Sequence, residues 1–308
     1  MSNLLLISNA HPQSFVNSGR YYALFNLMKS QLDFRIEVVT NYEIDDIKED
    51  VVIIFKSPEK DKPYVMSNLV DLPKNKTFIS YYSDIHTGGL SNDYTACMNR
   101  LLERSNKVLC AYNTPFIERW KVYQDKHIFF PHFVDHNLYS ELEVNPNPKM
   151  QCLVSGAAGK SYPLRRYIIN KGESRINVLP HPGYKPTEAT ILKNSGWKIG
   201  RDYSRTLNEH FCSVATPGYM GYAVAKYFEI PASGSLLLGK WIPDLDTLGF
   251  VDHKHYIAID ENNFSEVLQE VLDNPKKYED IRKHGRDFVL NNFTEEHSLE
   301  KLKRILDE

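Results

Sequence analysis

The chain has 308 residues, of which 42% are hydrophobic and 25% are charged, the composition of an ordinary globular protein. Its 37 basic and 39 acidic residues give a formal net charge of -2, so there is no basic excess to favour a nucleic-acid partner. The length predicts about two domains, each large enough for its own hydrophobic core.

Short strand-like runs alternate with helical patterns along the first half of the chain. Tyr21, Leu24 and Met28 recur at helical spacing, whereas 51–55 is apolar throughout, as a strand covered on both faces must be. Strands are expected at 4–7, 36–39, 51–55, 77–82, 107–111 and 127–130. Helices are expected at 18–31, 92–104 and 114–123. Strands that alternate with helices predict a parallel sheet with right-handed crossovers.

A segment rich in proline and asparagine, 141–149, interrupts this alternation and marks the expected linker. The alternation then resumes, which predicts a first domain over 1–140 and a second over 150–290. In the second domain, strands are expected at 150–154, 175–179, 211–215, 235–238 and 256–259. Helices are expected at 163–170, 187–194, 206–210 and 219–228, followed by a helical tail. We expect the last helix, within 291–308, to pack back on the N-terminal domain.

The cysteines and the apolar runs bear on the cellular compartment. The four cysteines, Cys97, Cys110, Cys152 and Cys212, form no C-x-x-C pair, which favours free buried thiols in a reducing compartment and disfavours a zinc site. The longest apolar runs are too short to span a bilayer, and residues 1–8 lack the features of a signal peptide. We therefore expect no transmembrane segment and a cytoplasmic protein.

The most informative stretch is 226–238, where a helix, a carboxylate, a small-residue turn and an apolar strand follow one another. Glu229 would accept hydrogen bonds from hydroxyl groups, and the backbone N–H groups of Gly234 and Ser235 would hold an anion. A nucleotide offers both features, ribose hydroxyls and phosphates. The alternative is a solvated glutamate at a helix end, which the helix dipole mildly disfavours.

The same stretch resembles the R-x-F-E-x-x-A-x-G-x-x-L-L block of group-1-type GT-B glycosyltransferases, in particular the subgroup that includes spore-maturation glycosyltransferases. Further segments resemble segments of that subgroup and occur in the same order along the chain: 161–165, 256–260, 273–275, 281–286 and 293–298. The resemblance covers roughly 149–306. Residues 1–140 are similar only in architecture, apart from a P-x-x-V-D-like element at 131–135.

The resemblance implies two Rossmann-like domains with parallel sheets that face a central cleft, with a sugar nucleotide held mainly by the second. Glu229 would take the ribose, and Gly234 and Ser235 would meet the diphosphate. Arg165 or Lys160 would neutralise the departing diphosphate, as a fixed cation does for developing charge. The alternative for these two cations is a solvated helix start.

Four further residues, Tyr219, Gly221, Lys226 and His181, belong to the expected donor site. Gly221 occupies the position where many retaining members have a second glutamate, so the resemblance does not imply retention. The stretch 218–222, which includes Tyr219 and Gly221, would instead let the sugar phosphate approach the backbone at a helix start. A simple helix start is the alternative. Lys226 replaces the motif's arginine and keeps its charge without the planar fork. His181 follows a strand and is either a contact to the sugar or base or a structural residue.

An inverting reaction needs a base to take the proton of the acceptor hydroxyl. In this fold the base would lie in the N-terminal domain, after a strand. Asp84 is the first candidate, followed by His86 and His11. The alternative is that Asp84 and His86 only shape a tight turn beside two glycines.

The sequence therefore predicts a hexosyl- or pentosyltransferase that moves a sugar from a nucleotide diphosphate sugar to an acceptor hydroxyl, in glycan, surface polysaccharide or glycoprotein synthesis. The partners would be the donor and a glycan, glycoprotein or lipid-linked acceptor, with no nucleic acid, no metal and no cofactor besides the donor substrate. A sugar-nucleotide epimerase and a non-catalytic nucleotide-sugar-binding paralogue remain as alternatives.

Overall fold

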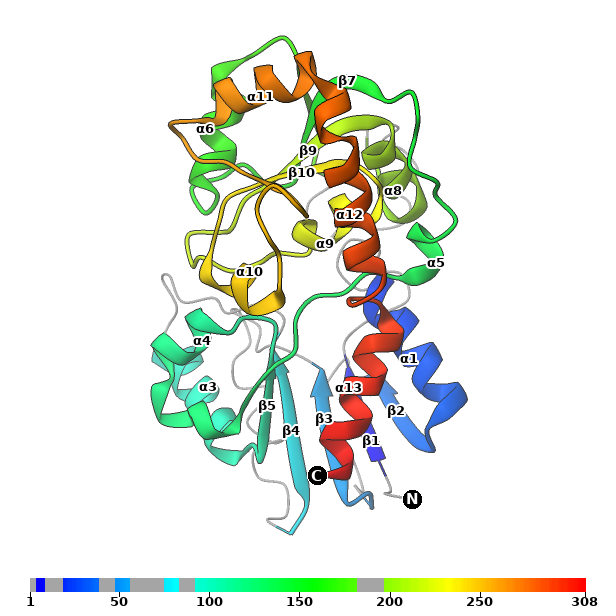
Figure 1. The fold of residues 1–308 in the computed structure, drawn as a ribbon. Coiled ribbons are helices and arrows are strands. Elements are labelled where there is room, and N and C mark those ends of the chain that lie inside the picture. Colours follow the sequence, from blue (N-terminus) through cyan, green and yellow to red (C-terminus); the bar gives the residue numbers. More distant parts are fainter. Residues whose placement is uncertain (1–3, 9–18, 39–47, 56–74, 83–91, 182–196) are drawn as a thin grey trace. The chain divides into compact units, whose positions relative to one another are not determined.

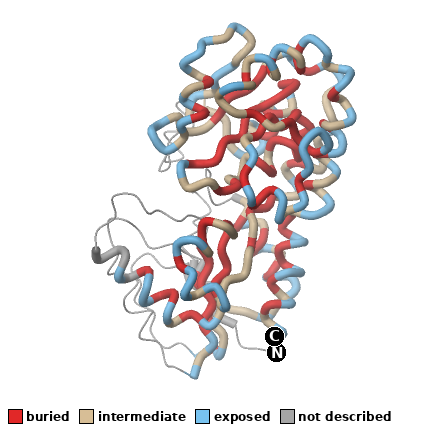
Figure 2. The backbone as a smooth tube through the Cα atoms, turned by 60° about the vertical axis from the view of Figure 1, so that its left-hand side comes forward, coloured by how far each residue is buried: buried red, intermediate tan, exposed pale blue. Residues whose placement is uncertain are grey.

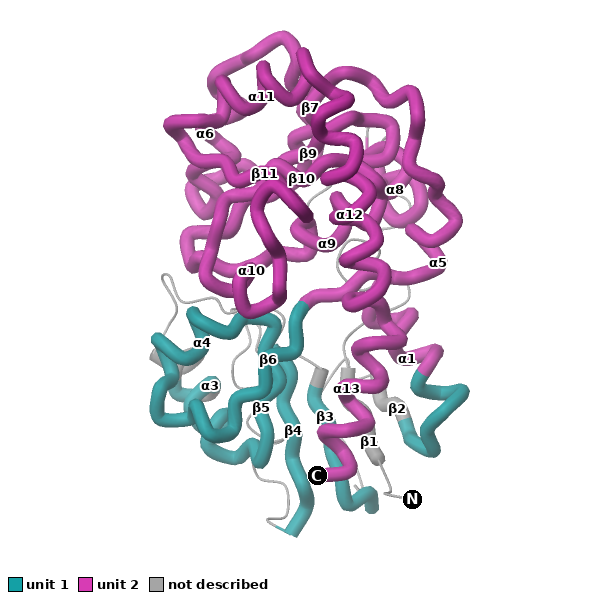
Figure 3. Tube along the Cα trace, in the orientation of Figure 1, with its two compact units in different colours: residues 1–11, 28–131 teal, residues 12–27, 132–308 magenta. Residues whose placement is uncertain are grey.

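The computed structural model describes residues 4–8, 19–38, 48–55, 75–82, 92–181 and 197–308 (Figure 1). The chain divides into two compact units (Figure 3). The first unit comprises residues 1–11 and 28–131, and the second comprises residues 12–27 and 132–308. Among the helices of the described residues, none combines the length and the apolar character that crossing a membrane requires.

The first unit is built on a six-stranded parallel sheet with the order β2-β1-β3-β4-β5-β6. Its strands are β1 (Leu4–Ser8), β2 (Phe34–Val38), β3 (Val51–Phe55), β4 (Thr77–Tyr82), β5 (Lys107–Cys110) and β6 (His127–Phe129). Its helical segments are the C-terminal end of α1 (Gly19–Gln31), α3 (Asn92–Arg104), α4 (Thr114–Arg119) and the 3₁₀ helix η2 (Lys121–Lys126). Ile53 and Ile54 point to opposite faces of β3 and are both fully buried, which confirms that this strand is covered on both faces.

The second unit is built on a five-stranded parallel sheet with the order β11-β10-β9-β7-β8. Its strands are β7 (Lys149–Ser155), β8 (Ile176–Leu179), β9 (His210–Ala215), β10 (Leu236–Gly239) and β11 (Ile257–Ala258). Its helices are α5 (His136–Tyr139), α6 (Pro163–Lys171), α8 (Gly200–Asn208), α9 (Lys226–Ala232), α10 (Pro243–Leu248), α11 (Phe264–Asp273), the 3₁₀ helix η3 (Pro275–Tyr278), α12 (Glu279–Leu290) and α13 (Glu295–Asp307).

Two hydrophobic cores cover the two faces of this second sheet. Figure 2 shows the buried stretches of the backbone in red. Leu237 belongs to one core, whereas its neighbours Leu236 and Leu238 belong to the other, because successive side chains of a strand point to opposite faces. Cys152 and Cys212 oppose each other on β7 and β9 as free buried thiols. Every residue of β9 is buried, so the sheet forms the rigid centre of the unit.

Helix α12 fixes helix α9 and the segment that follows α5. Arg286 donates to the carbonyl oxygen of Ala232 at 2.7 Å, at the C-terminal end of α9, and also to the carbonyl oxygens of Tyr139 and Leu142. Arg282 donates to the carbonyl oxygen of Gly234 at 2.9 Å. The buried Arg282 and the half-buried Arg286 thus satisfy carbonyls that a helix end and a loop leave unpaired.

The predicted helix at 219–228 is wrong in position. Residues 219–225 are not helical, and Gly221 has a φ of 71°, a left-handed conformation that interrupts a helix. Helix α9 instead begins at Lys226 and continues through Pro231 to Ala232. Glu229 therefore lies in the first turn of a helix and not at its end.

The short helix predicted at 206–210 is also wrong in its bounds. Helix α8 begins six residues earlier, at Gly200, and ends at Asn208. Thr206, whose type suggests a helix start, lies inside the helix, and its hydroxyl donates to the carbonyl oxygen of Asp202 at 2.7 Å. The helix predicted at 187–194 lies outside the described residues.

Candidate functional site

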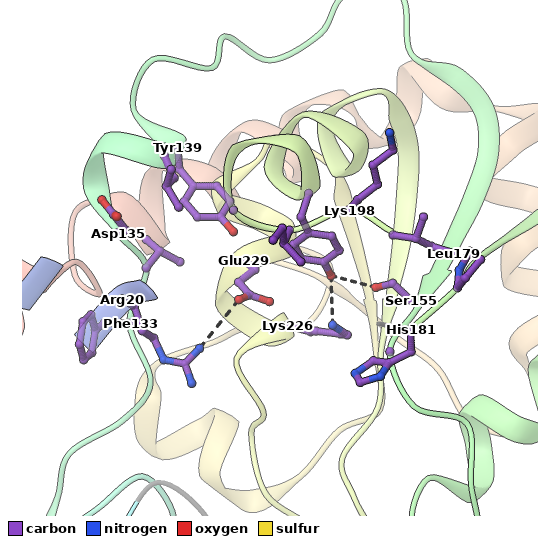
Figure 4. Close-up of a pocket in the computed structure, with 17 residues that line it drawn as sticks. Arg20, Phe133, Asp135, Tyr139, Ser155, Leu179, His181, Lys198, Lys226 and Glu229 are labelled. Atoms are coloured by element: carbon purple, nitrogen blue, oxygen red, sulfur yellow. Dashed lines mark hydrogen bonds and ion pairs between the residues drawn. The ribbon is translucent and has the colours of Figure 1, made fainter. Parts of the chain in front are cut away.

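A cavity of about 130 Å³ lies in the second unit, at the carboxyl ends of two neighbouring strands (Figure 4). Ser155 ends β7 and Leu179 ends β8, and both line the cavity. Glu229 contributes from the first turn of α9, and Arg20 contributes from α1. In parallel α/β sheets, ligands bind outside the carboxyl ends of the strands. The cavity therefore lies where the topology of the sheet predicts a binding site.

Glu229 supplies a carboxylate to this cavity. Its Oε1 lies 3.9 Å from Nη1 of Arg20, and the side chains of Glu229 and Arg20 are 21% and 14% exposed, respectively. The first turn of a helix favours a negative charge. Because 3.9 Å is longer than a hydrogen bond, the carboxylate oxygens are available to accept from hydroxyl groups of a ligand.

Lys226 supplies a cation on the same wall, one helical turn before Glu229. Its Nζ donates to the hydroxyl oxygen of Tyr203 at 3.1 Å and lies 5.0 Å from the centre of that ring. The same hydroxyl is 2.8 Å from Oγ of Ser155. The ammonium group is thus held by polar contacts beside the cavity that it lines.

Gly156, which lines the cavity, leaves room for the side chains of two cations, Arg165 and Lys226. It has a φ of 95°, and a Cβ placed on it would lie 2.7 Å from Nη1 of Arg165 and 2.8 Å from Cε of Lys226. Arg165 is buried, and its guanidinium group donates to the carbonyl oxygen of Ala157 at 2.8 Å. Only glycine fits this position, because any side chain would meet both cations and strain the backbone.

His181 lies in the positive potential of Lys226 and Arg165. It lines the cavity and is half-buried. Burial lowers the pKa of His181 below its ordinary value, and the charges of Lys226 and Arg165 lower it further. Its imidazole is therefore neutral at about pH 7, and the same potential that disfavours an imidazolium favours an anion such as a phosphate.

His132 lies beside the cavity and makes stability depend on pH. Burial and the charge of Arg20 hold its pKa well below the ordinary 6.5. Below about pH 6.5, the unfolded chain therefore takes up a proton that the folded chain does not, and stability falls with pH. Between about pH 7 and pH 5.5, the free energy of unfolding, measured with urea, is expected to fall by about 1 kcal/mol less in His132→Gln than in the parent. An equal loss in both proteins would contradict this assignment.

Gly234 and Ser235, predicted to hold a diphosphate, lie at the other edge of the sheet. They precede β10, and the hydroxyl of Ser235 donates at 3.0 Å to the carbonyl oxygen of His210, the first residue of β9. Their N–H groups already have acceptors, since Gly234 donates to the carbonyl of Pro231 at 2.8 Å and Ser235 to Oγ of Ser233 at 3.4 Å. This placement does not bring them to the cavity, so the expected role of these amides does not fit the structure.

Three other predicted residues follow strands at the correct edge but do not line the cavity. Lys160 is exposed in the loop after β7. Tyr219 is 54% exposed in the loop after β9, and its N–H donates to the carbonyl oxygen of Ser161 at 2.8 Å. A Cβ placed on Gly221 would meet no atom of the described residues within 4 Å.

The predicted catalytic residues Asp84, His86 and His11 lie outside the described residues. Within the described ranges, no group of three or more His, Cys, Asp or Glu side chains could hold a metal ion.

Several cavity residues were missed by the analysis of the sequence. Ser155 could have been found, because it ends a predicted strand at the edge where ligands bind. Tyr139 is fully buried beside the cavity, and burial together with the charge of Glu229 raises its pKa well above the ordinary value. Arg20 and Tyr203 come from distant helices, and no local pattern marks them.

Comparison with protein families gives one match to this chain. Residues 189–304 match a family model described as glycosyl transferase-like. A comparison with curated proteins gives no match.

Solved structures of similar architecture cover the whole chain. HepE from Anabaena, in complex with UDP and glucose, matches with a TM-score of 0.65 at 10% identity, over 100% of both chains. Sucrose-phosphate synthase from Thermosynechococcus elongatus matches with a TM-score of 0.68 at 11% identity, over 100% of this chain and 98% of its own. A glycosyltransferase from Rickettsia africae matches with a TM-score of 0.65 at 13% identity, over 99% of this chain and 97% of its own. The chain therefore has the α/β fold of GT-B glycosyltransferases, with two parallel sheets, and its residues 189–304 match the glycosyl transferase-like family model.

Proposed function

We propose that this protein is a glycosyltransferase that moves a sugar from a nucleoside diphosphate sugar to an acceptor hydroxyl. The observation that supports this proposal most directly is the pairing of a carboxylate, Glu229, with a cation, Lys226, in one cavity at the carboxyl ends of β7 and β8. The two groups complement the ribose hydroxyls and the diphosphate of one ligand.

The residues of the cavity suggest how the donor binds. Glu229 accepts hydrogen bonds from the ribose hydroxyls. Lys226, with the buried Arg165 behind it, faces the diphosphate, and the neutral imidazole of His181 can donate or accept a hydrogen bond there. When the sugar–phosphate bond breaks, negative charge grows on the diphosphate, and these fixed cations stabilise it more strongly than they stabilise the bound donor.

We propose uridine as the base, because HepE, which has the same fold, binds UDP. The sugar is proposed to be a hexose, and the acceptor is proposed to be a glycan or a lipid- or protein-linked glycan. The detailed resemblance of 226–238 further supports membership of the subgroup that includes spore-maturation glycosyltransferases. Asp84 is proposed as the base that takes the acceptor proton, on its sequence context alone.

Thermal unfolding in the presence of nucleotides tests the proposed function. A ligand that binds only the folded chain stabilises it by about 2.7 kcal/mol when its concentration is 100 times its dissociation constant. We expect UDP to raise the unfolding temperature clearly, uridine to raise it less at equal concentration, and inorganic phosphate to leave it unchanged. GDP and ADP serve as the comparison for the base. If no nucleoside diphosphate stabilises the protein, the proposed donor site is wrong.

Turnover then separates transfer from its alternatives. Incubation with UDP-glucose and a panel of acceptor sugars is expected to give UDP together with a glycosylated product. Conversion of the donor to an isomeric sugar nucleotide without an acceptor would identify an epimerase instead. UDP binding with no product from any acceptor would favour a non-catalytic binding protein.

A further inference from the structure

A residue outside the recognised motif fixes the side chain of Lys226. Tyr203 receives a hydrogen bond from Nζ of Lys226 at 3.1 Å, and its ring centre lies 5.0 Å from the same atom. The hydrogen bond and the contact with the ring together hold the ammonium group beside Tyr203. A lysine side chain carries about 2 kcal/mol of rotamer entropy. A partner that fixes this side chain in advance therefore lowers the cost of binding an anion.

Tyr203 is itself fixed from two directions. Its hydroxyl is 2.8 Å from Oγ of Ser155, the last residue of β7. Because an ammonium group only donates, the phenol oxygen accepts from Lys226, and its own proton is available to Ser155. On the other side, the hydroxyl of the buried Ser204 shares its proton between the carbonyl oxygen of Arg201 in its own helix, at 3.0 Å, and that of Leu138 in α5, at 3.2 Å, and so links α8 to α5. The phenol group thus has a defined position relative to both elements.

The path of the lysine side chain is also constrained before it reaches Tyr203. Cε of Lys226 would lie only 2.8 Å from a Cβ on Gly156, so the side chain runs directly over that glycine. Its route across Gly156 and its contact with Tyr203 together define the position of the ammonium group on the cavity wall.

We propose that Tyr203 is a positioning residue that holds the Lys226 ammonium group ready for the diphosphate of the donor, an inference that rests on the proposed function. Tyr203 acts through Lys226, and the Glu229 carboxylate is a separate group with its own partner, Arg20. The hydroxyl of Tyr203 therefore contributes to recognition of the phosphates and leaves recognition of the nucleoside unchanged.

The variant Tyr203→Phe tests this inference, because it removes the hydroxyl and keeps the ring. Isothermal titration is expected to show a dissociation constant for UDP that is about tenfold higher, and a dissociation constant for uridine that is unchanged. In a Lys226→Ala background, adding Tyr203→Phe is expected to have no further effect on UDP. Tyr167→Phe is the matched control: this tyrosine lies on α6, does not line the cavity, and has the Lys171 Nζ 5.3 Å from its ring centre.

The outcomes separate this inference from the proposed function. If the unmodified protein binds UDP and Tyr203→Phe binds it equally well, the positioning role is wrong while the proposed function stands. An equal loss for UDP and uridine, or a loss that persists without Lys226, would also overturn the inference, because Tyr203 would then only shape the cavity. If the unmodified protein binds another nucleoside diphosphate, the same comparison is made with that ligand and its nucleoside. If it binds none, both are overturned.

Discussion

The variant Glu229→Ala is expected to lower the affinity for UDP by roughly 100-fold. Each hydrogen bond between a neutral donor and a carboxylate contributes about 1.5–3 kcal/mol, and the ribose offers two hydroxyls. Because the ribose is common to both ligands, the affinity for uridine should fall by a similar factor. This pattern differs from that of Tyr203→Phe, which should weaken UDP binding alone. Isothermal titration of the variant with UDP and with uridine measures both dissociation constants.

Two controls accompany this prediction. Glu229→Gln keeps the shape and one acceptor oxygen, so its loss should be smaller than that of the alanine variant. Glu209→Ala removes another glutamate that pairs with a lysine, Lys149, but at the amino edge of the same sheet, and it should bind UDP normally. The loose Glu229–Arg20 ion pair contributes little to stability, so the unfolding temperature of Glu229→Ala should stay close to that of the parent. Normal UDP binding by Glu229→Ala would show that the ribose lies elsewhere.

The variant Gly285→Ala is expected to have the largest effect on stability. A Cβ at Gly285 of α12 would lie 2.5 Å from the carbonyl oxygen of His255 and 3.3 Å from Cβ of Pro231 in α9. Alanine favours a helix by about 1 kcal/mol over glycine, but this clash involves backbone that cannot easily move. Overpacking of this kind costs about 1–3 kcal/mol, so α12 must move away from the backbone of His255 and from Pro231, at a net loss of stability of about 1–2 kcal/mol.

Calorimetry measures this effect as a fall in the unfolding temperature of roughly 2–8 °C. The control is Gly159→Ala, because a Cβ at that exposed position meets no atom within 4 Å. The displaced Pro231 lies two residues after Glu229 in the same helix, so UDP affinity should fall as well. An unchanged unfolding temperature would mean that the α9–α12 contact is looser than the structure shows.

The strands were predictable because their patterns are local. Apolar runs such as 51–55 can only be strands covered on both faces, and the structure places β3 at these residues. The start of α9 was not predictable from the helical pattern, because the left-handed backbone at Gly221 is set by the fold of its loop. The start of α8 at Gly200 was also missed, and Thr206 lies inside that helix, where its hydroxyl donates to the carbonyl oxygen of Asp202.

In the candidate site, too, residues within one local motif were predictable and residues placed by the tertiary fold were not. Glu229 and Lys226 were recognised because they lie three residues apart in one motif, and the structure places both on the cavity. Gly234 and Ser235 are equally close in sequence, but α9 carries the chain to the opposite edge of the sheet before they occur. Arg20 and Tyr203 lie far from this motif in the sequence and reach the cavity only through tertiary packing. The motif therefore could not predict them.

The guanidinium groups of α12 bind main-chain oxygens in the segment after α5, and every type of residue presents the same oxygen. A substitution at Ser140, for example, leaves the carbonyl that accepts from Arg286 in place, whereas no other side chain could replace the several donors of Arg286 itself. Mutational drift should therefore be tolerated in this stretch of chain while α12 stays fixed. The path of the segment after α5 would then depend on a helix more than a hundred residues downstream, and not on the segment's own side chains.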